Sequence, residues 1–152
     1  MSLSRLVVAC AAAVCLLQSA GCAHATETLT VEYYPSPRPG AVFSQAVRVG
    51  NLLFLSGEVG TDSTGKLVPG GIQAEGRQAL NNLQHTVERL GSRMDRVAKC
   101  TVFLADIRDY AAFNEIYASY FRVRLPARSA MAASGLALNA RVEIECVALV
   151  DA

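Results

Sequence analysis

The alternation of apolar and polar residues predicts where this chain forms strands. Residues 28–33 alternate between polar and apolar side chains, which is typical of a half-buried strand. Residues 45–49 and 52–58 form a hairpin pattern around a Gly-Asn pair. Prolines and glycines before this hairpin, and again over residues 61–71, predict irregular loops.

The second half of the chain alternates between helix and strand patterns. Residues 72–90 place apolar side chains at helical spacing, and Gly91 follows them in the position that often ends a helix. The remaining predicted elements are a strand at 97–104, a helix at 110–121 and two closing strands at 127–134 and 140–150.

Two helices cannot cover both faces of a sheet of about six strands. We therefore expect an α+β domain in which both helices lie on one face of a mixed sheet. The other face needs a partner, and the simplest partner is a second copy in a symmetric homo-oligomer. The length of 152 residues suits one domain of this kind.

The first 21 residues are typical of a signal peptide. Arg5 supplies one charge, and residues 6–17 are apolar and too short to stay in a bilayer as a permanent helix. A buried N-terminal helix is the alternative, although the segment has no polar face. The sequence therefore predicts export to the periplasm, with a single mature domain over residues 26–152.

Two routes of signal processing stay open. The segment SAGC ending at Cys22 looks like a bacterial lipobox, although leucine is expected where Ser19 stands, and it would place a lipid on Cys22. The small-x-small sequence AHA predicts cleavage after Ala25 instead. We favour the lipoprotein, whose only attachment to the membrane would be the anchor on Cys22.

Charge and metal-ligand content exclude two classes of function. The chain has 14 Lys and Arg against 13 Asp and Glu, and only Arg5 among them precedes Cys22, so the mature domain is neutral. Without a basic stripe, nucleic-acid binding has no electrostatic support. His24 and His85 are the only histidines, and no spacing typical of a metal site surrounds them.

Two cysteines remain in the mature domain. Cys100 and Cys146 each lie within a strand pattern, where a cysteine is usually a small buried apolar residue. An exported setting also permits a disulfide between them. Both interpretations stay open.

One arginine interrupts the small, apolar segment PARSAMAA at residues 126–133. A guanidinium keeps its proton, and its burial is costly unless an anion meets it. Arg128 therefore has an acidic partner inside the protein or binds an anionic ligand. If the two closing strands pair, Arg128 lies near Glu143 and Glu145, and a structural ion pair is the alternative to a ligand site.

Seven short segments occur in an ordered set with compatible spacing. They are GNLLFLSG at 50–57, TGKLVP at 64–69, QAEGRQALNNL at 73–83, KCTVFLAD at 99–106, NEIY at 114–117, PARS at 126–129 and VEIE at 142–145. Together they resemble the Rid family, the reactive-intermediate (enamine/imine) deaminases that are also known as YjgF-like proteins. The resemblance covers about residues 28–150.

This resemblance implies a fold, an assembly and an activity. The fold would be the chorismate-mutase-like α+β fold, in a homotrimer with sites in the clefts between subunits. Deaminating members hydrolyse short 2-imino acids, such as 2-iminopropanoate and 2-iminobutanoate, and enamine tautomers such as 2-aminoacrylate. The products are 2-keto acids and ammonia, and the family uses no metal or organic cofactor.

The resemblance also implies site residues. Arg128 falls on the arginine that grips the substrate carboxylate, and Gly57 falls on a loop glycine whose backbone lines the pocket. Asn114 matches a pocket asparagine. Glu145 matches the glutamate associated with the attacking water.

Two substrate-pocket positions depart from the family pattern. Phe43 stands where a tyrosine is common, which removes a hydroxyl, and Ala130 replaces a frequent cysteine. We expect a deaminase with Arg128 and Glu145 as its catalytic pair. The alternatives are a module that binds a small carboxylate or a partner without turnover, and a holdase-like chaperone.

Overall fold

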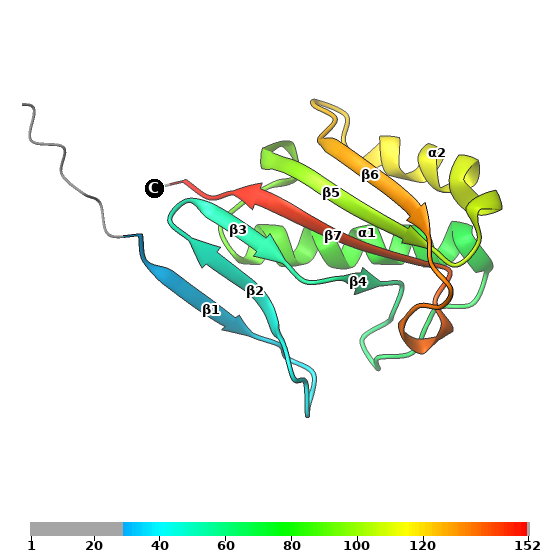
Figure 1. The fold of residues 1–152 in the computed structure, drawn as a ribbon, viewed down its shortest axis with the longest axis horizontal. Helices are drawn as coiled ribbons and strands as arrows, with labels where there is room; N and C mark the ends of the chain where they lie inside the picture. Colours follow the sequence, from blue (N-terminus) through cyan, green and yellow to red (C-terminus); the bar gives the residue numbers. More distant parts are fainter. Residues whose placement is uncertain (1–28, 152) are drawn as a thin grey trace, which may run out of the picture.

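The computed structural model describes residues 29–151 as one seven-stranded mixed sheet with helices packed against it (Figure 1). The strands are β1 (Val31–Pro35), β2 (Ser44–Val49), β3 (Leu52–Leu55), β4 (Glu58–Val59), β5 (Val97–Leu104), β6 (Ala127–Ala132) and β7 (Val142–Leu149). The helices are α1 (Gly71–Arg89) and α2 (Tyr110–Tyr120), with short 3-10 turns η1 (Met94–Arg96), η2 (Ile107–Asp109) and η3 (Ala137–Asn139). The predictions for the signal peptide, Cys22 and Ala25 lie outside the described residues.

The sheet follows the order β1-β2-β3-β7-β5-β6, and β4 pairs with β7 beyond the end of β3. Neighbouring strands are antiparallel except β5 and β6, which are parallel and are joined by α2. A parallel pair needs a crossover of this kind. Both helices lie on one face of the sheet (Figure 1), which confirms the predicted α+β class.

The two closing strands do not pair, so the condition for an ion pair between Arg128 and Glu143 or Glu145 is not met. Strand β7 pairs with β5, and β5 separates it from β6. The reason is the crossover through α2, which returns the chain parallel to β5 at the sheet edge, so that β7 must enter on the other side of β5. Arg128 on β6 is therefore not opposite the carboxylates of β7.

Local sequence signals fix most element boundaries. Gly50 has φ 58° in the turn between β2 and β3, a left-handed conformation that glycine adopts without strain. Helix α1 ends at Arg89, and Gly91 follows with φ 81°. The strand predicted to continue to residue 58 instead stops at Leu55 and resumes as β4 at Glu58.

The core lies between the sheet and the two helices. Leu80 and Leu83 from α1 pack with Phe113 from α2 against Val102 and Ile144 of the central strands, and all five are almost completely buried. Apolar burial of this kind is the main stabilising contribution to folding. The same layer contains a disulfide between Cys100 of β5 and Cys146 of β7, which lie directly opposite each other in the sheet.

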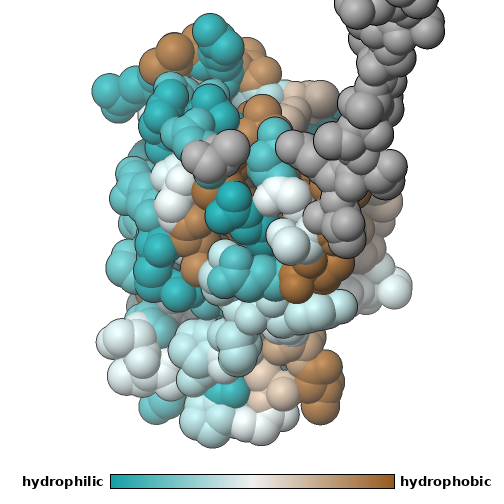
Figure 2. All heavy atoms as spheres, turned by 90° about the vertical axis from the view of Figure 1, so that its left-hand side faces the viewer, coloured by the Kyte–Doolittle hydropathy of each residue, from teal (hydrophilic) through white to brown (hydrophobic). Residues whose placement is uncertain are grey.

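The face of the sheet away from the helices, here named the open face, carries no further element of residues 29–151. It exposes Phe54, Met131 and Glu145, of which the first two are 44% and 46% exposed. Seen from the side of β1, the surface mixes apolar and polar patches (Figure 2).

Among the described residues, no helix has both the length and the apolar character needed to cross a bilayer.

Candidate active site

Arg128 projects from β6 to the helix-covered face and meets side chains of α2. Its partner position on β5 is Cys100, a core residue, and side chains at paired positions share a face of the sheet. One terminal nitrogen, Nη2, donates to Asn114 Oδ1 at 2.6 Å and to the Tyr110 hydroxyl at 3.2 Å. The guanidinium carbon lies 4.6 Å from the ring centre of Tyr117 and 5.5 Å from that of Tyr110.

These contacts hold Arg128 without neutralising it. None of the salt bridges among the described residues includes Arg128, so neither Glu143 nor Glu145 is its ion partner. Amide oxygen and aromatic faces attract a guanidinium but carry no full negative charge. The structure therefore brings Arg128 and Asn114 together, as the family resemblance implies, and leaves the positive charge available to an anion.

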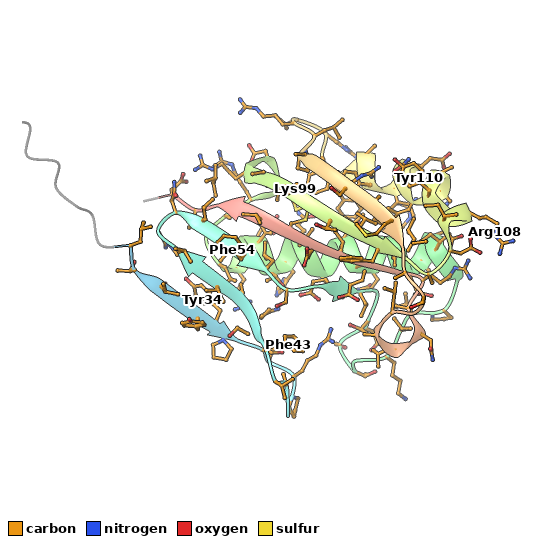
Figure 3. The ribbon with its side chains drawn as sticks, in the orientation of Figure 1. Tyr34, Phe43, Phe54, Lys99, Arg108 and Tyr110 are labelled. Carbon is orange, nitrogen blue, oxygen red and sulfur yellow. A yellow bond between two sulfur atoms is a disulfide. The ribbon has the colours of Figure 1, made fainter. Side chains whose placement is uncertain are left out.

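Glu145 lies elsewhere. It pairs across the sheet with Thr101, the residue after Cys100 on β5. Because successive residues of a strand point to opposite faces, the Glu145 side chain lies on the open face. There it lines a cavity of about 170 Å³ together with Phe54 and Lys99. Figure 3 shows Phe54 and Lys99 over the sheet and Tyr110 at the far end beside α2. Within one chain, Arg128 and Glu145 therefore occupy opposite faces of the sheet.

Gly57 lies in the break between β3 and β4. Phe54 pairs with Val147 and Glu58 with Ile144, so the first strand has one more residue than its partner over this interval. Such an irregularity is a β-bulge, and glycine is favoured where the backbone is approached closely. A side chain at Gly57 would overlap the carboxylate of Glu143.

Glu143 contacts Gly57, and this contact was not predicted from the sequence. It shares the open face with Glu145, two positions away on β7, and this period of two was visible in the sequence. What the sequence did not reveal was the pairing of β4 with β7, which places Val59 opposite Glu143 and brings its carboxylate onto Gly57.

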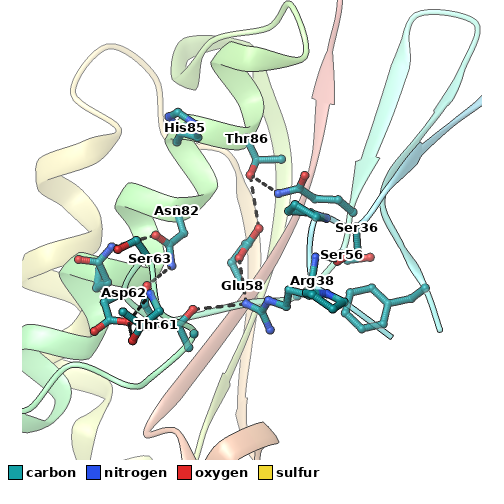
Figure 4. Close-up of a pocket in the computed structure, with 18 residues that line it drawn as sticks. Ser36, Arg38, Ser56, Glu58, Thr61, Asp62, Ser63, Asn82, His85 and Thr86 are labelled. Carbon is teal, nitrogen blue, oxygen red and sulfur yellow. Dashed lines mark hydrogen bonds and ion pairs between the residues drawn. The ribbon is translucent and has the colours of Figure 1, made fainter. Parts of the chain in front are cut away.

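A cavity of about 590 Å³ opens beside Gly57, between the β2–β4 segment and α1 (Figure 4). Phe43, Ser56 and Gly57 line one side of it, and Asn82, His85 and Thr86 of α1 line the other. Ser56 is fixed at this wall because its hydroxyl donates to the Ser44 carbonyl oxygen at 2.7 Å.

A buried carboxyl, Glu58, projects into this cavity (Figure 4). Its best contacts are long: the Thr86 hydroxyl donates to Oε1 at 3.4 Å, and Arg38 Nη2 lies 3.9 Å from Oε2. Loss of solvent raises the pKa of the Glu58 carboxyl, and the contacts with Gln45 and Arg38 oppose that rise. Glu58 is thus a weakly paired acid next to Gly57.

The remaining predicted residues divide between the two regions. Phe43 is half-exposed and lines the cavity beside Gly57. Ala130 lies two positions after Arg128 on β6 and packs against the core from the same face of the sheet. Figure 3 shows Phe43 near the start of β2, at the lower edge of the view, and Tyr110 at the upper right, at the start of α2. Within one chain, Arg128 and Gly57 therefore lie in two separate regions.

No group of three or more His, Cys, Asp or Glu side chains within residues 29–151 has the arrangement of a metal site. His85 lines the cavity beside Thr86 but belongs to no such group. The polar groups that line this cavity include the guanidinium of Arg38, the carboxyl of Glu58 and the imidazole of His85.

The sequence of this chain matches a known protein-family model. Residues 35–150 match the family model described as endoribonuclease L-PSP, which covers all seven strands apart from most of β1. The chain belongs to the L-PSP family. The Rid or YjgF-like proteins that the seven sequence segments resemble are members of the same family.

Curated relatives within the L-PSP family are similar over most of their length. The 2-iminobutanoate/2-iminopropanoate deaminase of Mus musculus is 46% identical over 114 residues, which are 73% of this chain and 84% of the mouse protein. The Homo sapiens protein of the same name is 44% identical over 114 residues, covering 73% of this chain and 83% of the human protein.

Solved structures of L-PSP proteins share the fold. RidA from the Antarctic bacterium Psychrobacter sp. superposes with a TM-score of 0.71 at 32% identity, covering 80% of this chain and 98% of that protein. The YjgF gene product of E. coli gives a TM-score of 0.68 at 30% identity, covering 77% of this chain and 92% of the E. coli protein.

Proposed function

We propose that this protein is a 2-iminobutanoate/2-iminopropanoate deaminase, a hydrolase that converts short 2-imino acids and their enamine tautomers into 2-keto acids and ammonia. The names of the mouse and human relatives support this reaction. The structural observation that carries it is the guanidinium of Arg128, which is held by Asn114 and faces no carboxylate among the described residues.

The active site is completed by a second copy of the chain. Arg128 lies on the edge strand β6, and Gly57 lies beyond β5 and β7, so one small substrate cannot touch both within a single chain. In a homotrimer, each cleft would receive Arg128 from one subunit and Gly57 from its neighbour. One substrate could then contact both residues. Apolar residues on the open face, such as Phe54 and Met131, would be covered in such an assembly.

In this proposal the chain's own groups perform each step of hydrolysis. Arg128 holds the substrate carboxylate through a fork of N–H donors, which orients the imine carbon. Water adds to the carbon of the protonated C=N group while a carboxylate accepts a proton from that water. Return of a proton to nitrogen makes it a leaving group; as the C–N bond breaks, the added hydroxyl gives its proton to the carboxylate or to water, so that ammonia leaves and a ketone remains.

Two glutamates are candidates for the proton acceptor. Glu145 is the residue that the family resemblance implies, and that assignment stays a prediction. Glu143 enters because its carboxylate lies against Gly57, which the resemblance places at the pocket wall. Both project to the open face of β7, and variants of each separate their roles.

The experiment generates 2-iminobutanoate in situ from the amino acid with an amino-acid oxidase, in the presence of catalase. Release of 2-oxobutanoate is then followed against the rate of spontaneous hydrolysis. The wild type should accelerate release, and Arg128→Ala should abolish the acceleration while retaining the native oligomer. Arg122→Ala, at an exposed arginine after α2, is the matched control and should behave as the wild type.

The alternative function is a non-catalytic module that binds a small carboxylate. It predicts no acceleration by the wild type, together with an increase in melting temperature when 2-oxobutanoate is added. A wild type that neither accelerates the reaction nor responds to 2-oxobutanoate would contradict both functions.

We also propose that the protein is exported to the periplasm, with a signal peptide over residues 1–21. The disulfide between Cys100 and Cys146 supports this, because disulfides persist in oxidising compartments and are rare in the cytosol. Mass spectrometry of the mature protein separates the two processing routes. A lipidated Cys22 indicates the lipoprotein, and a free amino group on Thr26 indicates cleavage after Ala25. An intact Met1 would contradict both.

A further inference from the structure

Tyr110, at the start of α2, touches Arg128 in two ways. Its ring centre lies 5.5 Å from the guanidinium carbon, and its hydroxyl oxygen accepts a hydrogen bond from Arg128 Nη2 at 3.2 Å. A tyrosine hydroxyl accepts and donates at the same time. The proton of the Tyr110 hydroxyl has no acceptor among residues 29–151, and the side chain is 41% exposed.

Only one of the three guanidinium nitrogens of Arg128 donates a hydrogen bond within the described chain. Both of its hydrogen bonds within the described chain come from Nη2, which contacts Asn114 and Tyr110. A guanidinium has five N–H donors, so those on Nε and Nη1 have no acceptor in this part of the chain. The Tyr110 hydroxyl therefore contacts a guanidinium group whose Nε and Nη1 donors are unused in the described chain.

Tyr117 keeps this arrangement rigid. Its ring centre lies 4.6 Å from the guanidinium carbon, and the residue is buried between α2 and the sheet. Burial raises the pKa of the Tyr117 hydroxyl to about 12, and the nearby charge of Arg128 opposes the rise, so this ring stays neutral. A guanidinium held over a fixed aromatic face loses little further freedom when it binds an anion.

We propose that Tyr110 is a second donor to the carboxylate of a 2-imino or 2-keto acid, acting beside Arg128 and determining affinity for the anionic end of the substrate. This rests on the proposed function for the identity of the anion. The hydroxyl donates to one carboxylate oxygen while the guanidinium donates to the carboxylate from its free N–H groups. Tyr110 takes no part in proton transfer, so it should affect binding and leave the chemical step unchanged.

The test is Tyr110→Phe, which removes the hydroxyl and keeps the ring. Tyr120→Phe is the matched control: it deletes a hydroxyl from the same helix, but one that bonds to Asn81 Oδ1 at 2.7 Å on α1. Isothermal titration with 2-oxobutanoate measures the dissociation constant, and the in-situ assay measures KM and kcat.

Tyr110→Phe should weaken binding of 2-oxobutanoate about tenfold, the effect of losing one hydrogen bond to a charged group. KM should rise by a similar factor, kcat should stay within about twofold, and Tyr120→Phe should change neither. A role limited to supporting the fold would instead lower the melting temperature of Tyr110→Phe and change kcat and KM together.

The outcomes separate this inference from the proposed function. If the wild type deaminates and Tyr110→Phe binds 2-oxobutanoate as tightly as the wild type, Tyr110 is no donor and the deaminase stands. If the wild type binds 2-oxobutanoate without turnover, and Tyr110→Phe weakens that binding, the donor role stands and the enzyme does not. If the wild type binds no 2-oxobutanoate, the inference is overturned.

Discussion

The carboxylate of Glu143 lies against the α-carbon of Gly57, in the space that any larger residue at that position would fill. The contact joins β7 to the break between β3 and β4, because β4 pairs with β7 directly beside it. Gly57 must therefore lack a side chain for the Glu143 carboxylate to keep this position.

This contact predicts which glutamate accepts the proton. Glu143→Gln should lower kcat for 2-iminobutanoate hydrolysis by about 100-fold, the usual effect of removing a general base. Glu145→Gln is the matched variant, two residues away on the same face of β7. We expect a much smaller effect there, because Glu145 faces the cavity beside Phe54 and Lys99. Equal loss in both variants, or a loss in Glu145→Gln alone, would contradict the assignment.

Gly57→Ala tests the same contact from the other side. The new methyl group would overlap the Glu143 carboxylate and displace it, so kcat should fall although no carboxylate has been removed. The dissociation constant for 2-oxobutanoate should change less than kcat, since Arg128 remains in place. A fully active Gly57→Ala would show that the close approach of Glu143 has no catalytic role.

Gly60 lies just after β4, where we expect any side chain to lower the stability of the fold. A Cβ atom there would lie 2.5 Å from the backbone oxygen of Glu75 and 2.6 Å from its α-carbon. These atoms belong to the backbone of α1 and cannot move aside as a flexible side chain can. Gly60→Ala should therefore lower the free energy of unfolding by about 1–3 kcal/mol, the range for overpacking.

Gly135 supplies the control for Gly60. A Cβ atom on Gly135 would meet no heavy atom within 4 Å, so Gly135→Ala should change the free energy of unfolding by less than about 0.5 kcal/mol. Urea denaturation of both variants gives the comparison. Equal stability of the two variants would show that β4 and α1 can separate freely.

The buried Glu58 predicts a pH dependence of stability. Because burial raises the pKa of its carboxyl above the unfolded value of 4.5, the folded state binds its proton more tightly than the unfolded state does. The resulting stabilisation is fully present below pH 4.5 and is lost as the pH rises through the pKa of the folded state. Glu58→Gln should remove this loss, so its stability should fall less than that of the wild type over the same interval.

Glu88→Gln is the control for Glu58→Gln, because it removes an exposed carboxylate from α1, the helix that also carries Thr86. Thermal unfolding between pH 4 and pH 8 should give Glu88→Gln the same pH profile as the wild type. A Glu58→Gln profile parallel to that of the wild type would show that ionisation of Glu58 does not lower the stability of the folded protein.

Local patterns in the sequence predicted elements whose signals are themselves local. The strand at 97–104 agrees with β5 at both ends, and the helix at 72–90 agrees with α1 to within one residue. Alternation and helical spacing depend on neighbouring residues alone, which explains this accuracy. The sequence left open whether the closing strands pair, because strand order depends on contacts between distant segments, which alternation does not encode.

In the candidate site too, features with a local sequence signal were predictable and those that depend on strand pairing were not. Arg128 was recognisable as an isolated charge in an apolar strand, and its contact with Asn114 agrees with the shared pocket that the resemblance implies. Glu143 could not be separated from Glu145 by sequence, since both lie on one face of β7. Only the register between β4 and β7, set by the bulge at Gly57, brings one of them against Gly57.

The disulfide between Cys100 and Cys146 gives the last prediction. The two residues are 46 positions apart, and closing a loop of that length restricts the unfolded chain by about 4 kcal/mol in the chain-entropy model. Protein produced in the periplasm and then treated with dithiothreitol should therefore lose about 10 °C or more in melting temperature. The double variant Cys100→Ala, Cys146→Ala is the control, and its melting temperature should not respond to the reductant. Free thiols at both positions in denatured but unreduced protein would show that the bond does not form, and would remove the main structural support for export.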